Sequence, residues 1–470
     1  MFTKSEQKPL ERGLFMIPLN NTDKKIINEI QEKQNNTENY LDFLNSNVKT
    51  LTHRYHVYPA MMIPNLAKEF IEITLKHQPN IKNIYDPFMG SGTTLVEGIA
   101  HNLNVYGQDI NPLSIFMTKA KTQTIEPDLL ESEISEFKLR VQNYYENVIY
   151  NKYVLDNTPN FKNVNFWFKP DVITKLQIIK NCINSIKNNT IKYFYFAAFS
   201  ETVRYVSNSR NNEFKLYRLA KEKLELWNPD VLKIFFEYLS RNQKANNDLF
   251  LTLKDANNLD PNVNIAKSDS SNDIRSFKDN SFDLVVTSPP YGDSSTTVAY
   301  GQFSRLSLQW LDLKIDEETN INKLDSIMLG GKVNKDLEIK EVLNYLNSDT
   351  LKDLFKKISE KDEKRAKEVL QFFIDLDSSL FNVSKLMKDN TYQYWVVANR
   401  TVKMINIPTD IIISELFEKY NVYHLHSFYR NIPNKRMPSK NSPTNIVGNH
   451  SVTMSSEIIL MFRKDLQNNL

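Results

Sequence analysis

The tetrapeptide Ser288-Pro289-Pro290-Tyr291 combines residue types that could hold a nucleobase for chemistry. The first proline restricts Ser288 to an extended conformation, and neither proline has an N–H group, so the carbonyl oxygens of Ser288 and Pro289 are left free to accept hydrogen bonds. These acceptors and the ring of Tyr291 suit the exocyclic amino group of a flipped base. Taken alone, the tetrapeptide is equally well explained as a Pro-Pro turn that leaves a strand.

A second segment begins at Asp86 and is rich in glycine. Gly90 and Gly92 let the backbone approach a ligand closely, and Thr93 opens a helical pattern whose N-terminus offers N–H groups to an anion. A phosphate-binding P-loop needs a lysine after its last glycine, where two threonines stand here, and a dinucleotide fingerprint needs a third glycine in place of Leu95. Because Asp86 would repel phosphate and attract an ammonium group, a ligand with both an amine and a carboxylate fits best.

A further acid follows the next β-like run, residues 104–108. This acid, Asp109, stands 23 residues after Asp86. An acid at such a place suits the hydroxyl groups of a ribose. Ile110, which follows it, is suited to packing on an adenine ring.

These residues need a scaffold that brings several strand ends together. Residues 282–287 are apolar, β-branched and stopped by two prolines, which is typical of a buried parallel strand. Residues 83–100 read as strand, glycine turn and helix, and ligands of open α/β sheets bind at the carboxyl ends of the strands. We therefore predict an α/β fold with a doubly wound, mostly parallel sheet. Further predicted elements are strands at 392–398, 423–429 and 457–462 and a helix at 407–420.

Together these motifs resemble those of S-adenosylmethionine-dependent DNA amino-methyltransferases of the Ser-Pro-Pro-Tyr type, the cytosine-N4-specific restriction-modification methylases. The likeness covers residues 50–120 and 260–312 well and is looser towards the C-terminus. It implies a seven-stranded methyltransferase sheet with a helical insertion, S-adenosylmethionine as the cofactor and double-stranded DNA as the substrate. It also implies a separate cognate restriction endonuclease as a partner.

The resemblance assigns roles to individual residues. Residues 53–70 are similar to the segment that closes over the methionine end of the cofactor, although an ordinary loop and amphipathic helix would also explain them. The motif Ser288, Pro289, Pro290 and Tyr291 would hold the base. The cofactor residues implied are Asp86, Phe88, Gly90, Gly92 and Thr93 for the methionine part, Asp109 for the ribose, Ile110 for the adenine ring and Asp269 for the adenine amino group.

The residue types favour an amino group as the methyl acceptor. The one cysteine, Cys182, lies at helical apolar spacing and is predicted to be core, so no thiolate is available for attack on a ring carbon. The sulfonium of the cofactor supplies the electrophile, and no metal is required. In the resembled family, Ser at position 288 favours cytosine N4 over adenine N6. Adenine N6, an RNA base amino group and a non-catalytic cofactor-binding module remain as alternatives.

Contact with nucleic acid must come from local patches, because the net charge is only +3. Two segments mix cations with aromatic and amide side chains, which suits phosphate contact and base reading. Each is also consistent with a solvated charged loop. The expected DNA-binding residues are Arg204, Arg210, Lys215 and Arg218 in the first segment and Arg430, Lys435 and Arg436 in the second.

A chain of 470 residues is long for one domain. We expect an N-terminal arm at 1–50, a cofactor-binding half at 51–119, a helical insertion for DNA recognition at 120–260, and a catalytic half at 261–470 with a helical insert at 313–388. The lone cysteine, the lack of a run of 18 apolar residues and the polar first residues predict a cytoplasmic protein without a membrane segment.

Overall fold

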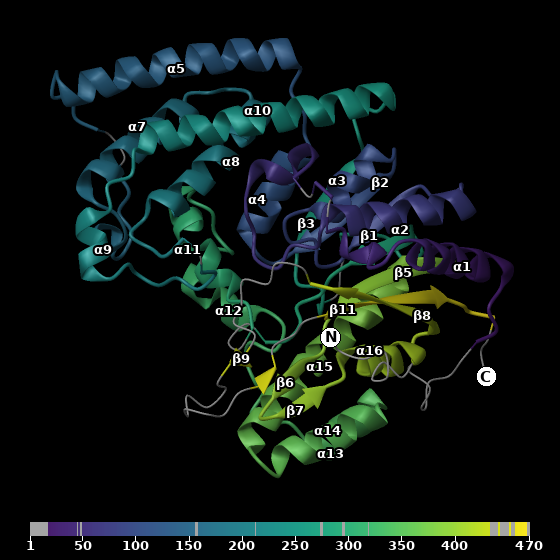
Figure 1. Ribbon diagram of the computed structural model, residues 1–470. Helices are drawn as coiled ribbons and strands as arrows, with labels where there is room; N and C mark the ends of the chain where they lie inside the picture. Colours follow the sequence, from purple (N-terminus) through teal and green to yellow (C-terminus); the bar gives the residue numbers. More distant parts are fainter. Residues whose placement is uncertain are drawn as a thin grey trace.

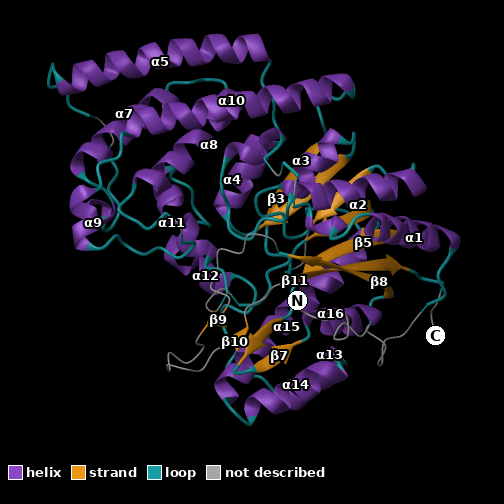
Figure 2. Ribbon diagram, in the orientation of Figure 1, coloured by secondary structure: helices purple, strands orange, loops and turns teal. Residues whose placement is uncertain are grey.

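The computed structural model describes residues 17–467 except 45, 48, 156–157, 212, 273–275, 294–296, 318, 433–439, 442–450 and 453–455. Its centre is a seven-stranded sheet with the order β3-β2-β1-β4-β5-β11-β8 (Figure 2). Strands β3 to β5 pair in parallel, and β11 is antiparallel to both β5 and β8. The strands are β1 Asn83–Asp86, β2 Asn104–Asp109, β3 Val263–Lys267, β4 Phe282–Thr287, β5 Met387–Val397, β8 Val422–Asn431 and β11 Ser456–Lys464.

The predicted doubly wound, mostly parallel α/β fold is confirmed. Strand β4 is buried at five of its six positions, which is why its sequence is apolar without alternation. The chain leaves β1 towards β2 on one side and pairs β1 with β4 on the other, so the strand order reverses there. Ligands of such sheets bind at this reversal, outside the carboxyl ends of the strands.

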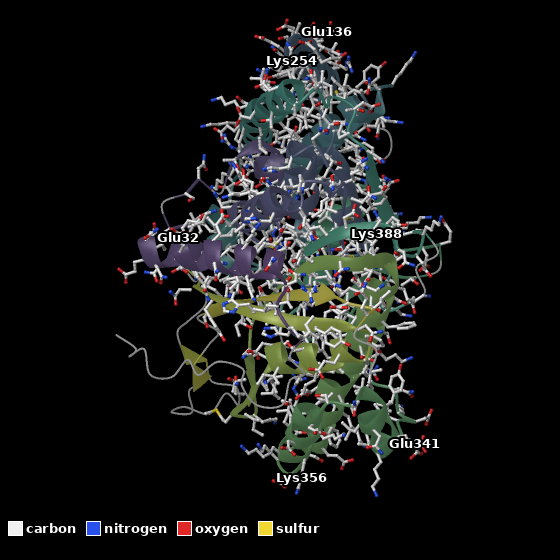
Figure 3. The ribbon with its side chains drawn as sticks, turned by 90° about the vertical axis from the view of Figure 1, so that its right-hand side faces the viewer. Glu32, Glu136, Lys254, Glu341, Lys356 and Lys388 are labelled. Atoms are coloured by element: carbon white, nitrogen blue, oxygen red, sulfur yellow. The ribbon has the colours of Figure 1, made fainter. Side chains whose placement is uncertain are left out.

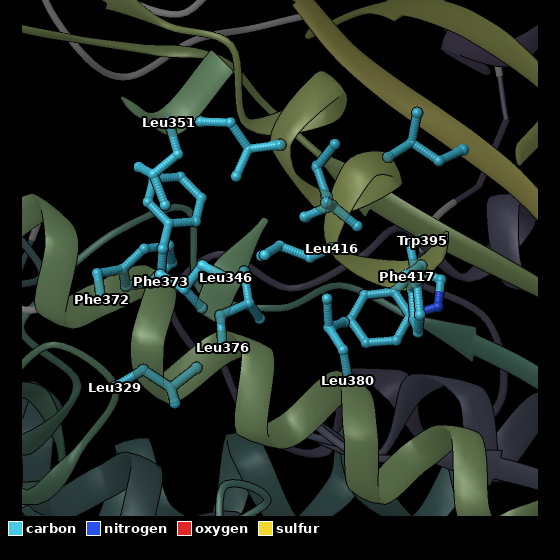
Figure 4. Packing of buried hydrophobic residues seen from close by; sticks show 14 of the residues in the cluster. Leu329, Leu346, Leu351, Phe372, Phe373, Leu376, Leu380, Trp395, Leu416 and Phe417 are labelled. Carbon is cyan, nitrogen blue, oxygen red and sulfur yellow. The ribbon is translucent and has the colours of Figure 1, made fainter. Parts of the chain in front are cut away.

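Helices cover both faces of the sheet. On one face, α1 (Asn21–Asn36), α2 (Pro64–His77), α3 (Thr93–Ala100) and the end of α10 (Val231–Asp255) enclose one apolar cluster with strand side chains. On the other, α14 (Asp349–Ser359), α15 (Glu363–Leu386) and α16 (Thr409–Glu418) enclose a second, in which Phe372, Phe373 and Leu376 of α15 pack near Leu416 and Phe417 of α16 (Figure 4). Each fully buried side chain of this kind stabilises the folded state by about 1.5–3 kcal/mol. The two helix layers therefore hold the strand ends in fixed positions.

A cluster of helices lies beside the sheet (Figure 1). Buried apolar side chains of these helices form a third core. Tyr55 and the buried Leu306 and Trp310 contribute to this core, so the cluster is joined to segments that flank the strands. Its helices are α5 (Pro127–Ile149), α6 (Val164–Trp167), α7 (Pro170–Asn184), α8 (Asn189–Val206), α9 (Lys221–Leu226), most of α10 and α11 (Tyr300–Trp310), and α4 (Pro112–Lys121) links it to β2.

Charged side chains of several helices lie on the surface at the two ends of the molecule (Figure 3). Glu136 and Lys254 lie at the outer end of the helical cluster, and Glu341 and Lys356 lie at the opposite end of the molecule (Figure 3). No helix in the described ranges is long and apolar enough to cross a membrane. The remaining elements are η1 (Tyr40–Asp42), η2 (Leu51–Tyr55), η3 (Ile321–Lys323), α12 (Leu324–Ile327), α13 (Ile339–Leu346), β6 (Arg400–Val402), β7 (Ile405–Ile407), β9 (Lys440–Asn441) and β10 (Ser451–Val452).

Candidate active site

A cleft opens at the carboxyl ends of β1, β2 and β4, where the strand order reverses. Its empty volume is about 820 Å³ including its open mouth, which is in the range of nucleoside-sized ligand sites. The lining residues are 58–62, 86–91, 93, 109–110, 268–270, 288, 290, 300 and 328–329. The structure therefore brings Asp86, Asp109, Asp269 and Ser288, which are far apart in the sequence, to one cleft.

The glycine turn adopts backbone conformations that favour glycine. Gly90 has φ +47° and Gly92 has φ +78°, both in the left-handed region. A Cβ atom on Gly92 would lie 2.7 Å from Cγ2 of Thr118, so the turn also packs too closely against α4 for a side chain. Thr93 then begins α3, whose first N–H groups point towards the cleft end of the sheet.

Two carboxylates stand at the strand ends. Oδ1 of Asp86 accepts hydrogen bonds from the Thr287 hydroxyl at 2.6 Å and from the Phe88 amide at 3.0 Å. Oδ2 of Asp109 accepts from the Gly90 amide at 3.0 Å. Burial raises the pKa of Asp86 to about 6 and that of Asp109 to about 6, against these hydrogen bonds. A cation in the cleft would offset that penalty.

Other residues expected at the cofactor also line the cleft. Phe88, Ile110 and Asp269 all contribute surface to it, and Oδ1 of Asp269 is held by the Ser271 amide at 2.9 Å. The segment from Tyr58 to Met62 forms one wall. This is the segment whose resemblance implied closure over the cofactor.

Three lining residues were not expected from the sequence: Tyr300, Met328 and Leu329. They come from segments on either side of α12, and the ring of Tyr300 lies 5.8 Å from that of Tyr58. No motif marks them, and Tyr300 begins α11, which packs against α4 and α8.

The Ser-Pro-Pro-Tyr segment follows β4 directly. Oγ of Ser288 donates to the carbonyl oxygen of Val396 at 3.1 Å, so its lone pairs are left to accept. Ser288 and Pro290 line the cleft, whereas Tyr291 is not among the lining residues and its hydroxyl donates to Glu457 at 2.9 Å. Tyr291 is partly exposed, and its role as a stacking surface for a base stays a prediction.

Two of the expected DNA-binding arginines are buried. Arg204 is 8% exposed, donates to the carbonyl oxygens of Phe303 and Glu213, and lies 4.0 Å from the centroid of the Phe303 ring. Arg430 is 5% exposed and its guanidinium group is paired with Glu457. Both guanidinium groups are buried and bonded to protein oxygens, and their contact with DNA stays a prediction.

The other expected DNA-binding residues differ in position. Arg210 is exposed, with a carboxylate of Glu213 at 3.1 Å, and Lys215 is half-buried. Arg218 lies 4.1 Å from the centroid of the Phe166 ring. Lys435 and Arg436 lie outside the described residues.

The prediction that Cys182 is a core residue is confirmed. Cys182 is buried on α7, and burial raises the pKa of its thiol to about 11. Within the described ranges no group of three or more His, Cys, Asp and Glu side chains is arranged to hold a metal ion.

The sheet order and the cleft define a ligand-binding protein of the doubly wound α/β class. Comparison with known proteins identifies the family. The chain is 60% identical over 447 residues to Type II methyltransferase M.MvaI of Kocuria varians, covering 95% of this chain and 98% of that protein. The chain therefore belongs to the Type II DNA methyltransferases, and it is a site-specific DNA methyltransferase that uses S-adenosylmethionine.

Other similarities are more limited. Residues 1–119 match a family described as DNA methylase. Type II methyltransferase M.MjaII of Methanocaldococcus jannaschii is 32% identical over 97 residues, which is 20% of this chain and 18% of that protein. The rRNA methyltransferase aviRa from Streptomyces viridochromogenes aligns with a TM-score of 0.31 at 10% identity, covering 87% of this chain and 89% of that one.

The cleft fits the chemistry of S-adenosylmethionine. The cofactor carries an ammonium group, a carboxylate, a ribose diol, an adenine ring and a sulfonium. The cleft offers the carboxylates of Asp86, Asp109 and Asp269, the N-terminus of α3 and apolar surfaces such as those of Ile110 and Leu329. Each ligand group thus has a complementary protein group in the same cleft.

Proposed function

We propose that this methyltransferase transfers the methyl group to the exocyclic N4 of cytosine in double-stranded DNA after base flipping. The observation that carries the proposal is Ser288: its hydroxyl stands at the end of β4 on the cofactor cleft, and its proton is directed to Val396. Serine at this position supports cytosine over adenine through the family resemblance.

Positions in and beside the cleft support the cofactor roles that the resemblance implies. Asp86 would receive the ammonium group, and Phe88, Gly90, Gly92 and Thr93 would enclose the methionine carboxylate and chain beside the N-terminus of α3. Asp109 would accept hydrogen bonds from the ribose, Ile110 would pack on the adenine ring, and Asp269 would accept from the adenine amino group. The positive charge of the cofactor would favour the ionised forms of Asp86 and Asp109.

The reaction needs positioning more than acid-base chemistry. S-adenosylmethionine supplies an electrophilic methyl group. The chain's task is to aim the amino nitrogen, whose lone pair is delocalised into the ring. Acceptance of its N–H groups by Ser288 Oγ and the Pro289 carbonyl oxygen would fix the nitrogen over the cleft, with Pro290 as a wall of the same site. The nitrogen would then bond to the methyl carbon in line with the carbon–sulfur bond, which breaks to leave S-adenosylhomocysteine, and one N–H proton would pass to solvent.

A DNA-facing role for residues 120–260 is part of the proposal. The loop that carries Arg210 and Lys215 is anchored to α11, since the Leu216 amide donates to Gln302 at 3.3 Å. Helix α11 begins at Tyr300, which lines the cleft. This connection supports the proposal, because it joins the exposed Arg210 and the half-buried Lys215 to the wall of the active site, where phosphate contacts would set the register of the duplex.

The test is incubation with labelled S-adenosylmethionine and either unmethylated DNA or RNA, followed by mass spectrometry of the nucleosides. N4-methyldeoxycytidine from DNA is the expected product. Detection of N6-methyldeoxyadenosine would show that the target is adenine and not cytosine. A methylated ribonucleoside, or no transfer, would overturn the proposal. A separate endonuclease that cuts the same unmethylated site is the expected partner, because the relative of 60% identity is named a Type II methyltransferase.

A further inference from the structure

Behind Ser288 runs a chain of hydrogen bonds that ends in a buried ion pair. Oγ of Ser288 lies 3.3 Å from the hydroxyl oxygen of Tyr291, which donates to Oε1 of Glu457 at 2.9 Å. Oε2 of Glu457 is paired with the guanidinium group of Arg430. Glu457 is the second residue of β11, and Arg430 lies on β8, directly opposite it in the strand register. Three separate segments therefore converge on one side chain of the active site.

The ion pair fixes the direction of every proton in the chain. Arg430 has only donors, and a carboxylate in a salt bridge with it offers only acceptors. Tyr291 must then donate its one proton to Glu457, which leaves the phenol oxygen able only to accept. Burial, followed by the negative charge of Glu457, raises the pKa of Tyr291 well above its usual value, so the phenol retains that proton.

The consequence falls on Ser288. Its single proton can go to Val396 at 3.1 Å or to Tyr291 at 3.3 Å, and both of these acceptors belong to the protein. In either arrangement the hydroxyl turns lone pairs and no proton towards the cleft. A base amino group, which brings N–H donors, meets an acceptor without any prior rotation of the hydroxyl.

We propose that Glu457 is a positioning residue that acts through Tyr291 to hold Ser288 as a hydrogen-bond acceptor, with Arg430 holding Glu457. This inference rests on the proposed function only in that Ser288 receives an amino group. It also gives Arg430 a role inside the active site in place of the DNA contact expected from the sequence.

The ion pair of Glu457 and Arg430 is largely shielded from solvent. The side chain of Glu457 is 15% exposed and that of Arg430 is 4% exposed, so both charges are held away from solvent. The Nε atom of Arg430 donates further to the Leu41 carbonyl oxygen at 3.1 Å. The guanidinium group is thus locked from two sides, and it presents Glu457 to Tyr291 in one orientation.

The test is a double-mutant cycle with Glu457→Gln, Tyr291→Phe and the double variant, measured as single-turnover methylation rates. In E457Q the amide can donate to Tyr291, whose proton can then turn to Ser288 and occupy the lone pair needed by the base. We expect the rate to fall about tenfold, the worth of one hydrogen bond of 1.4 kcal/mol. In the Y291F background the same change should have no further effect, because the connection to Ser288 is already absent.

Equal loss of rate in both backgrounds would overturn the inference, since it would mean that Glu457 acts without Tyr291. Cofactor affinity should be unchanged in all three variants, which separates a loss of positioning from a loss of binding. If E457Q does not fold, Glu457→Asp serves in the same cycle, because it keeps the charge for Arg430 and shortens the reach to Tyr291.

Tyr429→Phe is the matched control. It removes a phenol hydroxyl from the residue next to Arg430 on β8 and should leave the rate unchanged. The wild-type product distinguishes the two hypotheses. If wild type transfers no methyl group to a base amino nitrogen, the proposed function fails; if it does and the cycle is multiplicative, only the role of Glu457 fails.

Discussion

Replacement of Gly92 by alanine should destabilise the protein through two separable effects. The first is backbone strain, because φ of +78° lies in the left-handed region, where a side chain costs about 1–2 kcal/mol. The second is overlap: the new Cβ atom would lie 2.7 Å from Cγ2 and 2.8 Å from Oγ1 of Thr118. Thr118 is fully buried on α4, so the overlap costs about 1–3 kcal/mol more. We expect a total loss of about 2–5 kcal/mol in the free energy of unfolding.

Two further variants separate the effects. Gly90→Ala introduces a Cβ atom 3.5 Å from the Tyr58 ring at φ +47°, an ordinary contact, so only the strain of about 1–2 kcal/mol is expected. Thr118→Ala removes the two nearest atoms, Cγ2 and Oγ1, and leaves the Cβ atom of residue 118 at 3.1 Å. In that background the cost of Gly92→Ala should fall towards that of Gly90→Ala in the wild type.

The assay is urea unfolding followed by circular dichroism, with the slope of the transition compared across variants to confirm that the same structure unfolds. The free energies of Gly92→Ala and Thr118→Ala should be non-additive by about 1–3 kcal/mol, the size of the overlap. Additive losses would show that α4 does not close on the glycine turn and would refute the reasoning. A Gly92→Ala loss equal to that of Gly90→Ala would do the same.

Other predictions concern the carboxylates and the arginines. Asp109→Ala should raise the cofactor dissociation constant about 10–100-fold in calorimetry, since hydrogen bonds to a charged group are lost; unchanged affinity would remove Asp109 from the ribose site. The folded pKa of Asp86 is raised from 3.8 to about 6, so folding takes up protons between those values and its contribution to stability falls as pH rises through that window. An ammonium group favours the ionised form, so cofactor binding near pH 6 should release protons and weaken below pH 6, and Asp86→Asn should reduce both effects in calorimetry. Arg210→Ala should lower DNA affinity and reduce the slope of log affinity against log salt by about 1, whereas Arg204→Ala should lower the melting temperature; a salt slope unchanged by Arg210→Ala would remove that contact.

The sheet and the chemistry at its strand ends could be predicted because both depend on local sequence. Asp86, Asp109 and Ser288 each follow a short apolar run, and a parallel sheet must bring such ends to one edge. Strand β3 was not predicted, since four of its five residues are half-buried or exposed and its pattern carries little apolar signal. Tyr300 and Leu329 were missed for another reason: they reach the cleft through helix packing, which no local pattern encodes.

The arginines show where reasoning from charge fails. A cation-rich segment has the same sequence whether its charges meet solvent or a buried carboxylate, and Arg430 lies 27 residues before its partner Glu457. Only the register of β8 against β11 makes the two neighbours. Opposite charges at facing positions of adjacent strands favour pairing, so the predicted strands at 423–429 and 457–462 contained a testable signal once their pairing was considered. That pairing turns an expected DNA contact into the support of the Tyr291 hydroxyl. A motif fixes which groups reach a site, whereas their proton directions are set by partners that the motif does not contain.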